Sequence, residues 1–137
     1  MANQQAAMDM VPYVQIIGDL FVSEYYNVIL TRPHLLYKFY QHRSIFSRPD
    51  PSGKMLSATT VKGINQLITS VDYQSADNIE IKTIDSQASY NNGILVLVIG
   101  SITFRNSGTQ TFTQSFFLAP QKRGYFVFND VVRYLDE

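Results

Sequence analysis

The chain is 137 residues long, 45% of them hydrophobic and 16% charged, and its eleven basic side chains balance eleven acidic ones. This length and composition predict one folded domain with a substantial core and exclude extended disorder. The zero net charge argues against a nucleic-acid-binding domain, and the lack of cysteine excludes disulfides and thiolate metal sites. No apolar run is long enough for a signal peptide or a membrane span, so we expect a cytoplasmic protein.

Helical periodicity dominates the first half of the chain, after a flexible lead-in expected over residues 1–10. Apolar residues recur every three or four positions over residues 11–30, which predicts an amphipathic helix that Arg32 and Pro33 terminate. A second, short helix is predicted over residues 34–40. The sequence then predicts a short strand at 44–48, a turn at 49–53, an extended piece at 55–58 and a third helix at 61–71.

Strand patterns fill the second half. Residues 79–83 alternate between apolar and polar, as a half-buried strand does, and Asn92-Gly93 predicts a two-residue hairpin turn. Residues 94–99 are apolar on both faces of a strand, so both faces must be covered. Two more strands, 109–118 and 125–134, are predicted around a turn at 121–124. Helices followed by an antiparallel meander predict an α+β domain over residues 11–137.

Few residues offer catalytic chemistry. His34 and His42 are the only histidines, and we interpret both as solvent-exposed. No phosphate-binding glycine loop, nucleophile elbow or metal-ligand spacing is present in the sequence. The acidic residues near the end are interpreted as surface charges beside Arg133 or Lys122: Asp130, Asp136 and Glu137. We therefore expect no catalytic residue, no metal and no cofactor.

The chain is rich in aromatic residues, with nine Tyr and nine Phe. If the first two helices pack over the last strand, rings from all three elements converge, namely Phe21, Phe39, Tyr40, Tyr125 and Phe126. A groove lined by such rings, with Lys38 and Glu24 at its edge, would accept an aromatic side chain from an extended peptide. The same spacing also fits rings that only seal the core between helices and sheet.

Five segments resemble, in the same order, the motifs of nuclear-transport-factor-2-like domains. The resemblance extends over residues 11–137, essentially the whole domain. The matching segments are IGDLFVSEYY at 17–26, HLLYKFY at 34–40, KGI at 62–64, QSFFLAP at 114–120 and NDVVRY at 129–134.

This resemblance implies a cone-shaped fold in which three N-terminal helices pack on a strongly curved, mainly antiparallel sheet. It implies a homodimer whose sheets pack face to face, and a groove for short Phe-Gly-type motifs (FGDF-like or FxFG-like). The family's groove positions fall on Phe21, Phe39 and Tyr125, with Lys38 in place of an arginine and Glu24 in place of a glutamine. An apolar wall beside the groove is assigned to Pro12, Ile16 and Ile17.

Within the superfamily, the L-A-P strand end and the terminal R-Y-x-D-E resemble the N-terminal domain of the Ras-GAP SH3-domain-binding (Rasputin) proteins. That branch implies a non-catalytic scaffold module of an RNA-binding protein, found in the cytoplasm, in stress granules and at the nuclear envelope. Its expected partners are a second copy of itself and proteins with Phe-Gly motifs, such as nucleoporins or a deubiquitinase. The domain itself is expected to bind no nucleic acid and no membrane.

Two alternatives stay open. The first is a nucleocytoplasmic transport carrier that binds a small GTPase and Phe-Gly nucleoporins, as nuclear transport factor 2 does. The second, more remote, is an isomerase or dehydratase of the same fold. Such an enzyme needs a buried Asp, His or Tyr set inside the cone, where this sequence predicts mainly Ile, Val and Leu.

Overall fold

The computed structural model describes the backbone of residues 2–135 and the side chains of residues 13–135. The helices are α1 (Ala2–Thr31), η1 (Pro33–Phe39), α2 (Val61–Val71), η2 (Tyr73–Ser75) and η3 (Tyr90–Asn92), where η marks a 3-10 helix. The strands are β1 (Tyr40–Pro49), β2 (Met55–Thr59), β3 (Ala76–Ala88), β4 (Ile94–Phe104), β5 (Gly108–Pro120) and β6 (Tyr125–Leu135).

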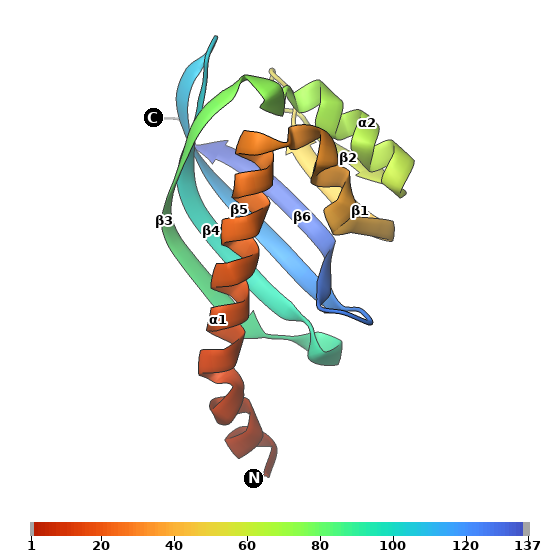
Figure 1. Ribbon diagram of the computed structural model, residues 1–137, viewed down its shortest axis with the longest axis vertical. Helices are drawn as coiled ribbons and strands as arrows, with labels where there is room; N and C mark the ends of the chain where they lie inside the picture. Colours follow the sequence, from red (N-terminus) through yellow and green to blue (C-terminus); the bar gives the residue numbers. More distant parts are fainter. Residues whose placement is uncertain (1, 136–137) are drawn as a thin grey trace.

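The six strands form one sheet in the order β2-β1-β6-β5-β4-β3. All neighbouring strands are antiparallel except β1 and β6, which run parallel and bring the early and the last part of the chain together. The sheet is strongly bent, with α1 lying along its concave face and α2 and η1 beside β1 and β2 (Figure 1). The predicted α+β fold, with three helices on a curved and mostly antiparallel sheet, is therefore confirmed.

The core lies between α1 and the concave face of the sheet. Strand side chains alternate between faces, so every second residue of β4 and β5 points towards the helix and is buried. Buried residues of α1 repeat every three or four positions and meet them. The innermost of these side chains are Val22, Tyr25 and Ile29 from α1, Val96 and Val98 from β4, and Phe116 and Leu118 from β5.

Helix α1 approaches β3 closely through two of its residues. A Cβ atom at Gly18 would lie 1.9 Å from the Ser86 Oγ, so only glycine fits at this crossing. The Gln15 side-chain amide donates to the carbonyl of Ile84 (3.1 Å) and accepts from the backbone amide of Ser86 (3.2 Å). These two bonds satisfy backbone groups on an edge strand, which would otherwise be open to pairing with another chain.

Most predicted elements are present, with different ends. The third helix, α2, has the predicted bounds, whereas α1 begins at Ala2 rather than at residue 11. The second helix is a 3-10 helix that gives way at Tyr40 to β1, so His42 lies on a strand and not in a loop. Both histidines are exposed, as predicted. The lead-in and the domain boundary at residue 11 stay predictions.

The two-residue hairpin turn predicted at Asn92-Gly93 is wrong. The connection is η3, closed by a bond from the Ser89 amide to the Gly93 carbonyl (2.8 Å), and its left-handed residues are Asn91 (φ 55°) and Asn92 (φ 62°). Gly93 itself has φ −79°. Its role is steric, because a Cβ there would lie 2.3 Å from the Phe117 ring.

The outer, convex face of the sheet is not covered by any described part of the chain. Leu95 and Leu97 are 43% and 40% exposed. They are outward-facing residues of β4, the strand whose two apolar faces are both predicted to be covered. On the same face, Phe117 of β5 lies opposite Leu95. Ser115 of β5 lies opposite Leu97, and the exposed Val131 of β6 lies opposite Ser115, so these three residues form a row across the strands. A contiguous apolar face of this kind is typical of an interaction surface.

Candidate functional site

The groove residues named from the sequence lie on three elements. Helix α1 carries Ile16, Ile17, Phe21 and Glu24, η1 carries Lys38 and Phe39, and β6 begins with Tyr125. The three rings and Ile17 are half-buried, while Ile16, Glu24 and Lys38 are exposed. The side chain of Pro12 lies outside the described residues.

Phe21 and Phe39 meet at the junction of α1 and η1. Their ring centroids are 5.7 Å apart in an edge-to-face arrangement, which aromatic pairs prefer. Phe21 also packs against Phe116 of β5 (5.1 Å), and both Phe21 and Phe39 contact the ring of Tyr25 (5.6 and 5.1 Å). Phe21 and Phe39 therefore converge over the sheet as predicted, and their rings remain partly open to solvent. The prediction that Phe126 joins them is wrong: it is the strand neighbour of the buried Val127, so it points to the outer face, where its ring lies 6.2 Å from that of Phe128.

Tyr125 lies on the same side of the sheet, farther towards the β5–β6 turn. It pairs with Pro120, two residues beyond the pair Leu118–Val127, whose side chains are buried in the core. Since strand side chains repeat every second residue, Tyr125 shares the concave face with them. The Tyr125 ring packs against the edge of the core. On the neighbouring strand β1, Tyr40 pairs with Val127, two residues after Tyr125.

Two opposite charges stand at the rim of this aromatic junction. Glu24 lies one turn from Phe21 on α1, and Lys38 precedes Phe39 on η1. Neither of them forms an ion pair within the part of the chain that the structure describes, where the pairs are Arg48–Asp130 and the exposed Arg105–Asp77. Both charges are therefore available to a bound molecule.

Beneath the junction lies a buried polar network centred on Asp130, which is fully buried. Its carboxylate accepts hydrogen bonds from Arg48 (2.7 and 3.1 Å), Gln114 (2.9 Å), Tyr25 (3.0 Å) and Tyr40 (2.5 Å). The prediction that Asp130 is a surface charge is wrong. Its place follows from the parallel pairing of β1 and β6, which sets Asp130 beside Phe46.

Arg48 completes the network and was not recognised from the sequence. It is 1% exposed, its Nε donates to the Tyr73 hydroxyl (2.9 Å), and its guanidinium lies 3.9 Å from the centroid of the Phe46 ring. Burial opposes the charge on Arg48, but Asp130 and the tyrosines outweigh it and raise the pKa of Arg48. The expectation that mainly Ile, Val and Leu line the cone interior is therefore also wrong, because a closed ion pair occupies it.

Four tyrosines of this interior hold their protons tightly. Burial, and next the negative charge of Asp130, raise the pKa of Tyr25 and Tyr40 well above the usual value. Burial also raises the pKa of Tyr26 and of Tyr134. All four hydroxyls therefore act as neutral groups, and the Tyr26 hydroxyl donates a hydrogen bond to the side-chain carbonyl of Gln114 (2.5 Å).

These raised pKa values predict a loss of stability in alkali. Below about pH 10, tyrosines are protonated in both states; above it the unfolded chain loses protons that the folded chain keeps. The unfolding free energy should then fall with rising pH, by up to about 1.4 kcal/mol per pH unit for each such tyrosine. Urea midpoints measured from about pH 9 to about pH 11 test this.

The control for this experiment is a pair of Tyr→Phe variants. Tyr134→Phe removes one titrating group of the interior and should make the alkaline loss shallower, whereas Tyr90→Phe changes an exposed ring of η3. Equal slopes in Tyr134→Phe and the parent would contradict the assignment.

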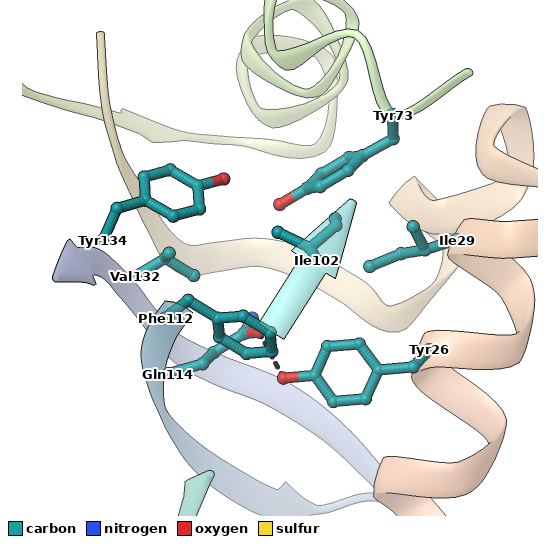
Figure 2. A pocket seen from close by; sticks show the side chains of 8 residues that line it. All are labelled: Tyr26, Ile29, Tyr73, Ile102, Phe112, Gln114, Val132 and Tyr134. Atoms are coloured by element: carbon teal, nitrogen blue, oxygen red, sulfur yellow. Dashed lines mark hydrogen bonds between the residues drawn. The ribbon is translucent and has the colours of Figure 1, made fainter. Parts of the chain in front are cut away.

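The remaining space inside the cone is small. A cavity of about 10 Å³ lies next to the Tyr26–Gln114 hydrogen bond (Figure 2), which is room for about one water molecule. Figure 2 shows the surrounding side chains pointing into this space: Tyr26, Ile29, Tyr73, Ile102, Phe112, Gln114, Val132 and Tyr134. Among the described residues the buried carboxylate is Asp130, which is paired with Arg48. The cavity itself is too small for an organic substrate.

Two larger hollows lie on the surface, away from the aromatic junction. One, of about 600 Å³, lies between the β1–β2 turn, the end of α2 and the β4–β5 turn, and includes Asp50 and Arg133. The other, of about 330 Å³, lies between η1 and α2 and includes His34 and Asp72. Neither is lined by Phe21, Phe39 or Tyr125.

Among the residues that the structure describes, no three His, Asp or Glu side chains gather as a metal site would need. In the same part of the chain, no helix is both long and apolar enough to cross a membrane.

Comparison with known proteins assigns the chain to a family. Residues 17–134 match the Nuclear transport factor 2 (NTF2) domain. The whole chain is 42% identical to a protein of Arabidopsis thaliana named Nuclear transport factor 2, and 88% of it is 36% identical to a putative G3BP-like protein of Schizosaccharomyces pombe. The chain spans only 29% and 28% of the lengths of these two relatives.

A shorter relative and two solved structures agree with this. Nuclear transport factor 2 of Saccharomyces cerevisiae is 30% identical over 85% of the chain and 90% of its own length. Nuclear transport factor 2 of Cryptosporidium parvum superposes with a TM-score of 0.79 at 29% identity over 90% of this chain and 96% of that one. A chain of the yeast deubiquitinase Ubp3 and Bre5 cofactor complex superposes with a TM-score of 0.79 over 90% of this chain and 98% of that one. At 23% identity this similarity shows a shared fold and nothing more.

The chain therefore belongs to the nuclear transport factor 2 domain family. The family predicted from five short motifs is confirmed, and the named relatives are transport-factor and G3BP-like proteins.

Proposed function

We propose that this domain is a non-catalytic, dimeric protein-docking module whose aromatic groove binds Phe-Gly-type peptide segments. The observation that carries the proposal is the Phe21–Phe39 edge-to-face pair, half-buried at the junction of α1 and η1 and flanked by the unpaired charges of Glu24 and Lys38. A partner ring inserted here would meet aromatic edges, and a glycine after that ring would let its backbone approach closely.

The groove is proposed to be weak by itself and stronger in pairs. Burying one Phe ring contributes roughly 1.5–3 kcal/mol, part of which association consumes. One ring alone is therefore too little for tight binding, and we expect one groove, with its backbone and rim contacts, to bind no more tightly than the micromolar range, about −8 kcal/mol. Two grooves in a dimer would raise the apparent affinity for partners with repeated motifs.

The homodimer is proposed to form through the outer face of the sheet. This face carries Leu95, Leu97 and Val131, all 40–43% exposed, together with the half-buried Phe117. Stable homodimer interfaces are large and more apolar than ordinary surface. The concave face is already filled by α1, so the convex face is the apolar surface of the sheet that remains for a second copy.

Two finer functions fit such a module. The transport carrier has more support from relatives, because proteins 42% and 30% identical to this chain are named Nuclear transport factor 2. The scaffold of an RNA-binding protein is supported by the G3BP-like relative, which is also much longer than this chain. A deubiquitinase partner is suggested only by the yeast Ubp3 and Bre5 complex.

One experiment separates these functions. Immobilised domain is exposed in parallel to a small GTPase of nuclear transport and to Phe-Gly peptides. Binding of both favours the carrier, and binding of the peptides alone favours the scaffold. Imaging of the tagged full-length protein at the nuclear envelope and in stress granules gives an independent answer.

Phe39→Trp tests the groove itself. The larger ring should overfill the space beside Phe21 and abolish Phe-Gly peptide binding, because well-packed sites tolerate added volume poorly. Isothermal titration with a Phe-Gly peptide measures the loss. The matched control is Tyr37→Trp, which enlarges another half-buried ring of η1 and should leave binding in place.

The same variant must keep its fold for the result to count. We expect its thermal midpoint and its sedimentation mass to stay close to those of the parent. Peptide binding as tight as that of the parent would place the site elsewhere. Unfolding would mean that Phe39 serves the core, since its ring contacts Tyr25 above the buried network.

A further inference from the structure

The outer surface of α1 carries apolar side chains that no described part of the chain covers. Tyr13, Ile16 and Leu20 are 66%, 57% and 67% exposed, and among the large hydrophobic residues that the structure describes only Tyr90 is more exposed. Their spacing of three and four residues places them in one stripe on the helix. We call this stripe the α1 ridge. Such a cluster of exposed apolar side chains typically marks an interaction surface.

The α1 ridge lies next to the proposed groove, with Glu24 between them. Glu24 is one turn beyond Leu20 and three residues beyond Phe21, so it is a neighbour of both on the helix surface, with Cβ atoms about 5–6 Å apart. Its carboxylate is exposed and forms no ion pair within the described residues. Groove, unpaired negative charge and ridge therefore follow one another around α1.

We propose that the α1 ridge is a second anchoring surface for the peptide that the groove binds. The ligand class is an extended segment with an aromatic anchor, a basic residue and a second apolar residue at alternating positions. The aromatic anchor enters the groove at Phe21, the basic side chain pairs with Glu24, and the apolar side chain packs on Leu20 and Tyr13. This inference rests on the proposed function of the groove.

The spacing of an extended chain suits this arrangement. Side chains on one face of such a chain are two residues, or about 6.8 Å, apart. That step is close to the distance of about 5–6 Å between neighbouring side chains on α1. Successive residues of a helix point about 100° apart, so the side chains of Leu20 and Phe21 diverge on either side of Glu24. A short segment crossing the helix can therefore place successive same-face side chains over Phe21, Glu24 and Leu20.

The area of the ridge favours a peptide over a second copy of the chain. An aromatic side chain offers about 150–250 Å², so three side chains exposed by about two-thirds supply at most roughly 500 Å². A stable protein–protein interface needs about 800 Å² from each partner. The charge of Glu24 also argues against two copies meeting here, since a symmetric contact would bring like charges together.

The test compares two fluorescent peptides by anisotropy on the purified domain. One contains the core Phe-Gly-Lys-Ser-Leu, and the other contains Phe-Gly-Ser-Ser-Ser, which keeps only the groove anchor. We expect the first to bind about tenfold more tightly. Leu20→Ser should bring its affinity down to that of the second peptide while leaving the second unchanged. Tyr90→Ser, which alters an equally exposed apolar residue on η3, is the matched control.

Glu24→Gln tests the charge in the same assay. It should weaken the lysine-containing peptide and strengthen a Phe-Gly-Glu-Ser-Leu peptide relative to the parent domain. Equal affinities of the two original peptides, or a Leu20→Ser variant that binds both as the parent does, would overturn the ridge while leaving the groove intact. If neither peptide binds the parent domain, the proposed function fails with it. A changed sedimentation mass in Leu20→Ser would assign the ridge to a contact between copies and would also overturn the inference.

Discussion

Asp130→Ala is expected to lower the unfolding free energy by about 3–5 kcal/mol, the usual cost of removing one partner of a buried ion pair. The substitution leaves Arg48 charged at 1% exposure and removes the acceptor of five hydrogen bonds. Urea denaturation at neutral pH measures the loss. If the variant does not fold at all, the same conclusion holds, since typical domains have only about 5–15 kcal/mol in total.

Two comparisons make this prediction specific to the buried pair. Asp77→Ala breaks the exposed pair with Arg105 (3.7 Å) and should cost less than about 1 kcal/mol. The double variant Arg48→Met, Asp130→Leu should recover part of the loss, because apolar replacements of a buried pair are often tolerated. A loss in Asp130→Ala no larger than in Asp77→Ala would show that the network contributes little to stability.

Val131→Glu is expected to convert the proposed dimer into a monomer. Val131 lies near the middle of the outer face, in a row with Leu97 and Ser115. A symmetric interface would bury two such glutamates without partners, at a cost of several kcal/mol. Sedimentation equilibrium at micromolar concentration should give about twice the chain mass for the parent and the single chain mass for the variant.

The control places the same charge elsewhere. Tyr90→Glu changes an exposed residue of η3 and should leave the mass at that of a dimer. Circular dichroism should show both variants folded, since exposed positions tolerate substitution to within about 0.5 kcal/mol. A parent that sediments as a monomer would contradict the proposed interface outright.

The sequence predicts the elements of this fold well where the signal is local. The helical spacing of α2 and the alternation of Ile79 and Ile81 with polar residues in β3 depend only on neighbouring residues, and both are confirmed. The junction of Phe21 and Phe39 is also predicted, because the two helices that carry them are adjacent in the chain. Whether that junction binds a peptide stays a prediction.

The buried network could not be predicted in the same way, and β6 shows why. The register between β5 and β6 shifts between Phe117, which pairs with Asn129, and Leu118, which pairs with Val127. Phe128 is therefore an extra residue of β6 at this point. Such a bulge reverses which residues face inwards, so Val127 and Asp130 are both buried although they are an odd number of residues apart. Simple alternation from Val127 places Asp130 outside. Its partner Arg48 lies on β1, and no local pattern connects the two.

The parallel pairing of β1 with β6 also has a consequence for how the domain is made. Strand β1 leaves the ribosome well before its neighbour β6, which is the last strand of this domain in chain order. Until then Arg48 lacks the carboxylate of Asp130, and the proposed groove lacks Tyr125. Contacts so distant in sequence form late and slow folding. We therefore expect nascent chains to gain protease resistance and partner recognition together, only after β6 has emerged.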